Sequence, residues 1–266
     1  MESAQDYWAA RAALDWQVEL GADEALGETP VNRFELVDPP RAKAPLTTQD
    51  KPPANAALAA GQAQNTHLAA LKIDPVAEAA KAAAAAQDLA ELREALAAFE
   101  HCDLKRGARN LVFADGTAGA RVMILAEAPD REGDREGKPF VGQSAALLGK
   151  MLGAIGLSLE ESVYVGTVMP WRLLNQSGPS PEQVAMMRPF VARHIALAAP
   201  DIVILMGNLA CDAVLGQRGI TRLRGTWAEA DGLPVMPMFP PETLMRQPEL
   251  KRAAWADLLE IKARLG

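Results

Sequence analysis

Uninterrupted runs of apolar residues alternate with segments of helical composition over most of the C-terminal half of the chain. The apolar runs cover residues 122–126, 163–169, 202–206 and 235–239, and the helical segments cover about 143–156, 181–199, 208–215 and 249–264. Such runs are typical of strands that are buried on both faces of a parallel sheet and are covered by helices. The pattern predicts an α/β fold with three layers, αβα, around a central four-stranded parallel sheet.

The first hundred residues follow a different pattern. Residues 4–20 have the composition of a helix that ends at Gly21, whereas residues 37–63 contain five prolines and predict a mobile linker. Asp74 and Pro75 are typical of a helix start, and the alanine-rich stretch 76–98 predicts one strong helix. We therefore expect a helical and partly disordered N-terminal extension, divided into a helical segment 1–36, a linker 37–73 and a helix 74–100, before an α/β domain at 101–266.

Charge is distributed unevenly between these parts. The chain carries a net charge of −7, which argues against binding of DNA by overall charge alone. Residues 1–100 hold 8 Lys/Arg and 16 Asp/Glu (−8), whereas residues 101–266 hold 19 Lys/Arg and 18 Asp/Glu (+1). Because phosphate contacts depend on the clustering of cations, the nearly neutral part can still present a basic face.

The sequence gives no sign of a membrane segment or of export. It has no run of 18 apolar residues and no basic start followed by an apolar stretch. Its two cysteines, Cys102 and Cys211, are too few for a disulfide framework. We expect a cytoplasmic protein that has no membrane partner.

The first predicted strand leads directly into polar loops. It ends in Ala126-Glu127-Ala128-Pro129-Asp130, and Gly137-Lys-Pro-Phe-Val-Gly142 follows closely. Open α/β sheets bind their ligands in loops that follow the carboxyl ends of strands. These loops are therefore the first candidates for a functional site.

These two motifs, with residues 169–172, 219–225 and 238–248, resemble the family 4 uracil-DNA glycosylases over residues 101–266. The resemblance implies a uracil-DNA-glycosylase-like fold, DNA as partner, and hydrolysis of the N-glycosidic bond of a deaminated or damaged base in base-excision repair. Two alternatives stay open: a catalytically decayed homologue that binds DNA or a protein, or a scaffold whose N-terminal extension mediates assembly with a protein partner. The sequence alone leaves enzymatic activity undecided.

The resemblance assigns roles to the loop after the first strand. Its backbone, from Ala126 through Ala128 and Pro129 to Asp130, would cradle the flipped base. Glu127 would carry the catalytic carboxylate that stabilises a cationic sugar or orients water, unless it only caps the following turn. Asp130 stands at a glycine of the family and adds a Cβ and a charge where the substrate should approach.

Three further base contacts follow from the same resemblance. Phe140 would stack on the extruded base, unless it only anchors its loop in the core. Thr167 stands at an asparagine of the family and, unless it is an ordinary strand residue, offers one hydroxyl instead of an amide. Pro240 stands at a histidine and has no side-chain donor, and one lost donor of this kind costs roughly a hundred- to thousand-fold in rate. Both changes argue against standard uracil activity.

Basic and apolar residues near the C-terminus would contact DNA. Arg222, Arg224 and Arg246, all expected on loops, would bind phosphates, and Leu244 and Met245 would enter the base stack. The alternative for the arginines is a solvated basic loop.

Cofactors are not expected. Many family 4 enzymes hold an iron–sulfur cluster with four cysteines, and this chain has two. Cys102 stands where one ligand would occur, Cys211 is expected to be a small buried residue, and His194 is expected to be structural. We therefore predict no cluster and no other metal.

Overall fold

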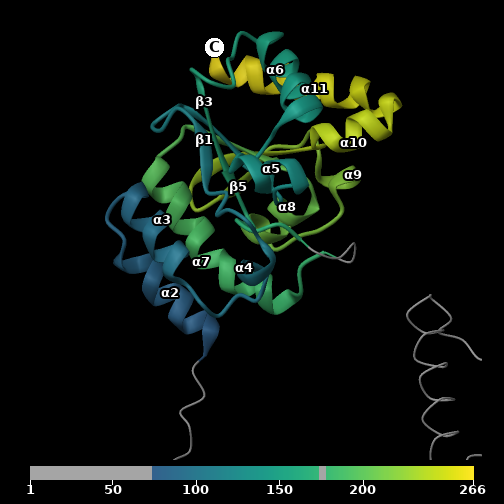
Figure 1. Cartoon of the computed structure of the whole chain (residues 1–266). Helices are drawn as coiled ribbons and strands as arrows, with labels where there is room; N and C mark the ends of the chain where they lie inside the picture. Colours follow the sequence, from purple (N-terminus) through teal and green to yellow (C-terminus); the bar gives the residue numbers. More distant parts are fainter. Residues whose placement is uncertain (1–73, 174–177) are drawn as a thin grey trace, which may run out of the picture. The chain divides into compact units, whose positions relative to one another are not determined.

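The computed structural model describes residues 74–173 and 178–266 (Figure 1). The predicted helix at 4–20 and the segments 1–36 and 37–73 lie outside the described residues. The described residues all belong to one compact unit, Asn65–Gly266.

A six-stranded mixed sheet forms the centre of this unit, in the order β1-β3-β2-β4-β6-β5. Its four inner strands are parallel, as predicted: β2 (Val122–Ala126), β3 (Val163–Thr167), β4 (Ile202–Met206) and β6 (Leu233–Met238). Two antiparallel edge strands, β1 (Ala114–Gly116) and β5 (Ala228–Ala230), were not predicted. Each has three residues and is only partly buried, so it leaves no apolar run in the sequence.

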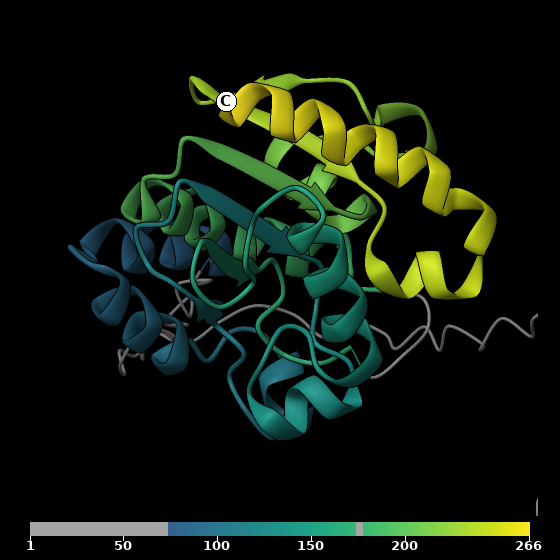
Figure 2. The same ribbon diagram turned by 90° about the horizontal axis from the view of Figure 1, so that it is seen from above.

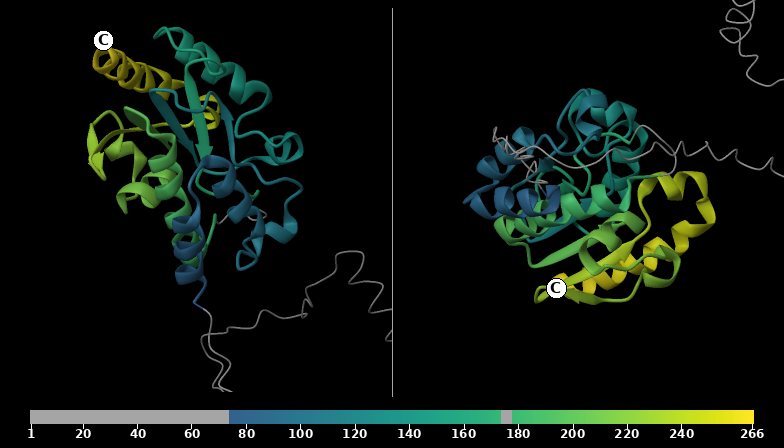
Figure 3. Two further views of the ribbon diagram at one scale, coloured as in Figure 1. Left: turned by 90° about the vertical axis from the view of Figure 1, so that its left-hand side faces the viewer. Right: turned by 90° about the horizontal axis from the view of Figure 1, so that it is seen from below.

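Helices cover both faces of the sheet, which confirms the three-layer prediction. The chain moves from β2 to β3 through α6 (Gly142–Gly153) and then back to β4 through α7 (Pro181–Ala198). Right-handed crossovers in opposite directions place these two helices on opposite faces. Helices α10 (Pro241–Arg246) and α11 (Lys251–Leu265) pack with α6, while α8 (Asn208–Leu215) packs with α7. Figures 2 and 3 show the same arrangement from other sides.

The alanine-rich segment forms two helices, so the prediction of a single helix was wrong. These are α2 (Pro75–Ala85), which Asp74 caps as predicted, and α3 (Leu89–Ala98). The Asp88 carboxylate accepts a hydrogen bond from Glu91 N at 2.8 Å and begins the second helix. An Asp side chain that binds backbone N–H groups competes with helix continuation, which explains the break. Both helices pack against α7.

Short elements complete the fold. They are α4 (Leu104–Gly107), α5 (Arg131–Glu136), α9 (Ile220–Leu223) and the 3-10 turn Pro248–Leu250. Among the described helices, none is long and apolar enough to cross a membrane.

A buried histidine joins α7 to the sheet, as expected for a structural role. The His194 ring stacks on Phe113 with ring centres 4.2 Å apart, and its Nε2 lies 2.8 Å from the Tyr164 hydroxyl. A Cβ at Gly166 would lie 2.9 Å from the ring, so glycine leaves the space that the imidazole occupies. Burial lowers the pKa of His194 to about 4, so the ring is neutral at pH 7.

Candidate active site

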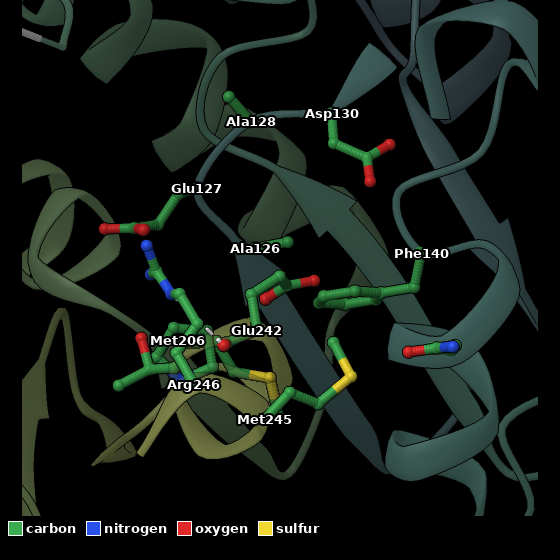
Figure 4. A pocket seen from close by; sticks show the side chains of 12 residues that line it. Ala126, Glu127, Ala128, Asp130, Phe140, Met206, Glu242, Met245 and Arg246 are labelled. Carbon is green, nitrogen blue, oxygen red and sulfur yellow. Dashed lines mark hydrogen bonds between the residues drawn. The ribbon is translucent and has the colours of Figure 1, made fainter. Parts of the chain in front are cut away.

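A pocket of about 590 Å³ opens at the carboxyl end of the parallel strands (Figure 4). Ala126 ends β2, Met206 ends β4, and Pro240 follows β6. Eight of the residues proposed from sequence lie together in its wall: Ala126, Glu127, Ala128, Asp130, Phe140, Pro240, Met245 and Arg246. The other lining residues are Gln143, Met206, Glu242 and Thr243.

Glu127 follows β2 and is held at the N-terminus of α8, which follows the neighbouring strand β4. Its Oε1 accepts a hydrogen bond from Leu209 N at 2.8 Å. Burial raises the pKa of Glu127, while the N–H groups of Leu209 and Asn208 oppose that shift by stabilising the ionised form. The Glu127 carboxylate therefore caps the start of α8 and not the turn that follows residue 127. The same carboxylate also faces the pocket. This geometry is compatible with a fixed negative charge at the pocket wall.

Gly207 makes the position of Glu127 possible. Its φ is 101°, and a Cβ there would lie 2.4 Å from the Glu127 side chain. Sequence reasoning did not assign a role to this glycine. Its place directly after the buried strand β4 was the available signal, because parallel strands end at the same edge.

Asp130 caps α5 at the rim of the pocket. Its Oδ1 accepts a hydrogen bond from Gly133 N at 2.7 Å. Its φ of −77° is ordinary for any residue, so the local backbone does not require the glycine of the family pattern. The side chain is exposed and adds negative charge to the rim.

Phe140 belongs to both the core and the pocket. The residue is 8% exposed, and its ring contributes to the pocket wall. Both alternatives from the sequence, a stacking face and a core anchor, are thus compatible with its position.

Two residues proposed as base contacts do not line the pocket. Thr167 is 5% exposed, and its hydroxyl donates to the Val112 carbonyl at 2.7 Å. Pro129 is also buried outside the lining. The proposed contact from Thr167 is therefore corrected: the hydroxyl already has a backbone partner and fastens β3 to the segment before β1.

Two of the proposed DNA contacts are engaged within the protein instead. Leu244 is 1% exposed and faces an apolar groove between α6 and α11, so it cannot enter a base stack in this conformation. Arg224 forms an ion pair with the buried Asp257 and donates to Ala253 O at 2.7 Å. Burial raises the pKa of Asp257, and Arg224 opposes that shift.

Arg222 and Arg246 remain exposed to solvent. They lie in α9 and at the end of α10, so the expectation that all three arginines lie on loops was wrong. In Figure 4 the Arg246 side chain extends toward Glu127, whose carboxyl pKa its charge lowers as a minor effect.

Glu242 is the main pocket residue that sequence reasoning missed. It is half-buried at the start of α10. Burial raises its pKa, its own backbone N–H and the Ser144 hydroxyl oppose that shift, and the charges of Asp130 and Glu127 add to it. The signal was available, because Glu242 follows β6 just as Glu127 follows β2.

A second groove, of about 640 Å³, is lined by five arginines. Two acidic residues share it, and the buried Asp134 uses its Oδ1 to accept from Arg109 N and Asn110 N, at 2.8 and 3.2 Å. The surplus of cations suits phosphate groups. The arginines are Arg106, Arg109, Arg131, Arg135 and Arg172.

Both cysteines are buried. Cys211 lies in α8, and burial raises the pKa of its thiol to about 12, with a smaller contribution from the charge of Glu127. Within residues 74–173 and 178–266, no three His, Cys, Asp or Glu side chains are grouped to hold a metal ion. The absence of a cluster stays a prediction from the cysteine count.

Comparison with known proteins now places the chain. The model of the uracil DNA glycosylase superfamily matches residues 113–259. The Type-4 uracil-DNA glycosylase of Thermotoga maritima is 30% identical over 167 residues, which cover 61% of this chain and 86% of that protein. The Type-4 uracil-DNA glycosylase of Archaeoglobus fulgidus is 29% identical over 169 residues, covering 60% and 84%. A DNA polymerase of Bacillus phage SP01 is 29% identical over 150 residues, 56% of this chain but 16% of that protein.

A three-layer α/β fold with its pocket at the carboxyl end of a parallel sheet, matched over more than half its length, defines the class: the chain belongs to the uracil-DNA glycosylase superfamily. Within it, the similarity to the Type-4 enzymes confirms the family 4 resemblance of the motifs.

Proposed function

We propose that this protein is a DNA glycosylase that hydrolyses the N-glycosidic bond of a deaminated or damaged base, a step of base-excision repair. The observation that carries the proposal is one pocket that joins the Glu127 carboxylate to the Phe140 ring at the carboxyl end of the sheet. The Type-4 uracil-DNA glycosylases among its relatives support the same reaction.

Each of these residues has a chemical role in the proposed reaction. The C1′–N bond breaks as the base leaves with the bonding electrons, and water adds to the sugar carbon. The ionised Glu127, stabilised by Leu209 N–H, offsets positive charge on the sugar or orients that water. Phe140 replaces part of the stacking that the base loses when it leaves the helix.

Recognition of the base must use other contacts than those of the family pattern. The Thr167 hydroxyl is bound to the Val112 carbonyl, and Pro240 has neither a side-chain donor nor an N–H. The two side chains that bind uracil in the family pattern, an asparagine and a histidine, are therefore replaced at positions 167 and 240. We propose that the preferred base differs from uracil or is bound through a different side chain.

Single-turnover incubation with oligonucleotides tests the function. Single- and double-stranded substrates would carry uracil, hypoxanthine or xanthine, and abasic product would be measured after alkaline cleavage. We expect the wild type to release at least one of these bases. Binding without release of any base would favour the decayed homologue.

Glu127→Gln tests the mechanism on the same substrates. Glutamine keeps the size and loses the charge, so excision should fall at least about a hundredfold, while binding measured by gel shift persists. Glu249→Gln, an exposed residue outside the pocket, is the matched control. Full activity in Glu127→Gln would remove this residue from the mechanism and would direct attention to Asp130, which also lines the pocket.

A further inference from the structure

The acidic residues of the pocket differ in how their carboxyl groups are placed to form hydrogen bonds with a base. One oxygen of Glu127 accepts from Leu209 N, and Asp130 caps α5 at the exposed rim. Glu242, in contrast, is half-buried, and Figure 4 shows its carboxyl group extending into the pocket in the direction of the Phe140 ring. A base stacked on Phe140 would therefore have its edge near this carboxyl group.

We propose that Glu242 is a specificity-determining residue whose neutral carboxyl group pairs with a C=O and an adjacent N–H at the edge of the extruded base. The inference rests on the proposed glycosylase function. A protonated carboxyl group carries one O–H donor beside one acceptor. Uracil, hypoxanthine and xanthine each present a carbonyl next to an N–H, so one side chain can satisfy both groups.

The surroundings of Glu242 raise the pKa of its carboxyl group. Burial raises its pKa first, and the negative charges of Asp130 and Glu127 act in the same direction. Its own backbone N–H and the Ser144 hydroxyl oppose the shift. The charged groups that face it are Glu127 and Asp130 from the loop after β2 and Arg246 from its own helix; α6 contributes the uncharged Ser144 and Gln143. Proteins use such sites to keep a carboxylic acid protonated as a hydrogen-bond donor.

The proposal predicts a characteristic pH dependence. An ionised Glu242 would present two acceptors and repel the carbonyl of the base, so recognition should fall as pH rises through its raised pKa. Glu127 must be ionised to act, so its own raised pKa gives the rising limb of excision at lower pH. The wild-type rate should therefore pass through a maximum.

Two variants and a binding measurement test this in the full-length protein. Excision is followed from pH ~5 to ~9, a range in which a raised carboxyl pKa is visible. Glu242→Ala should lower excision by about tenfold to a hundredfold, the discrimination of one bidentate base contact. Glu242→Gln should recover most of that loss and abolish the falling limb while the rising limb stays, because an amide is also a donor and an acceptor but does not titrate. Glu249→Gln, outside the pocket, should follow the wild type.

Binding separates this inference from the proposed function. The affinity for a uracil or hypoxanthine oligonucleotide is compared with that for the same strand carrying a tetrahydrofuran abasic analogue, which isolates the contribution of the base. That contribution should shrink in Glu242→Ala and return in Glu242→Gln, whether or not the base is excised. Wild-type excision and base contribution that persist in Glu242→Ala, or a falling limb that persists in Glu242→Gln, would overturn the role of Glu242 alone. A wild type with neither excision nor a base contribution would overturn both.

Discussion

At the scale of single residues, the site depends on tight packing between groups that are distant in the sequence. Glu127 occupies the volume that a side chain at position 207 would need. Its carboxylate accepts a hydrogen bond from Leu209 N at the start of α8. Arg224 and Asp257 show the same dependence away from the pocket, since each neutralises the charge of the other. Small changes at these positions should therefore have large and separable effects.

Gly207→Ala should lower stability and excision together. Its φ of 101° is unfavourable for alanine, and the added Cβ must displace Glu127. We expect roughly 1–3 kcal/mol of lost stability, measured by denaturant unfolding, and excision as low as in Glu127→Gln. Gly149→Ala, in α6 with open space around its Cβ position, is the control and should be neutral or stabilising. Equal behaviour of the two variants would show that Gly207 does not position Glu127.

Arg224→Ala should destabilise the domain and have no specific effect on DNA binding. It leaves the buried Asp257 carboxylate without its cation, and breaking such a pair costs about 3–5 kcal/mol. Arg222→Ala, at an exposed site nearby, should leave the free energy of unfolding unchanged within about 0.5 kcal/mol. A stable Arg224→Ala protein with weakened DNA binding would restore Arg224 as a phosphate contact.

At the scale of elements, β3 and α7 are coupled through one buried imidazole. His194 touches Phe113 and Tyr164 and fills the space above Gly166. The short strand β1 pairs with β3 on the outer side, and the Thr167 hydroxyl adds a bond to the Val112 carbonyl. The edge of the sheet therefore depends on polar groups that must stay neutral or paired.

The stability of this region should depend on pH through His194. Its pKa is lowered from 6.5 to about 4 in the folded state, so the stabilisation is present above the unfolded value. It is lost as pH falls from about 6.5 toward about 4, because the unfolded chain binds the proton first. We expect up to about 3 kcal/mol, measured as the difference in pH dependence between the wild type and His194→Gln. Parallel curves for the two proteins would mean that His194 is not buried as described.

At the scale of the whole molecule, the local charge of individual surfaces differs from the net charge of the chain. The domain combines a pocket with three acidic residues in its wall and a groove with five arginines, although the chain as a whole carries −7. Under the proposed function, the groove offers a place for backbone phosphates that does not involve Arg224, which is paired with Asp257. Binding should then respond to salt in proportion to the number of phosphates contacted.

Arg109→Ala combined with Arg131→Ala should weaken DNA binding and flatten its salt dependence. Each lost phosphate contact reduces the slope of log K against log salt by about 0.9 for duplex DNA, so the double variant should lose roughly twice that. Both arginines are exposed, and the fold should survive. Arg93→Ala, on α3 outside both the pocket and the groove, is the control. An unchanged slope in the double variant would place the phosphate contacts elsewhere, with Arg222 and Arg246 as the next residues to test.

The local pattern of the sequence determined the four parallel strands, the helices between them, the caps at Asp74 and the loops that follow β2 and β6. Each of these features is set by neighbours along the chain, through apolar runs and turn residues. Edge strands of three residues and the break before Asp88 leave weaker signals, and they were missed. The orientation of side chains could not be predicted from the sequence. Thr167 and Leu244 point away from the pocket, whereas Glu242 points into it. Arg224 points toward Asp257. Only tertiary packing decides such directions, because the partners that satisfy or bury these side chains come from distant parts of the chain.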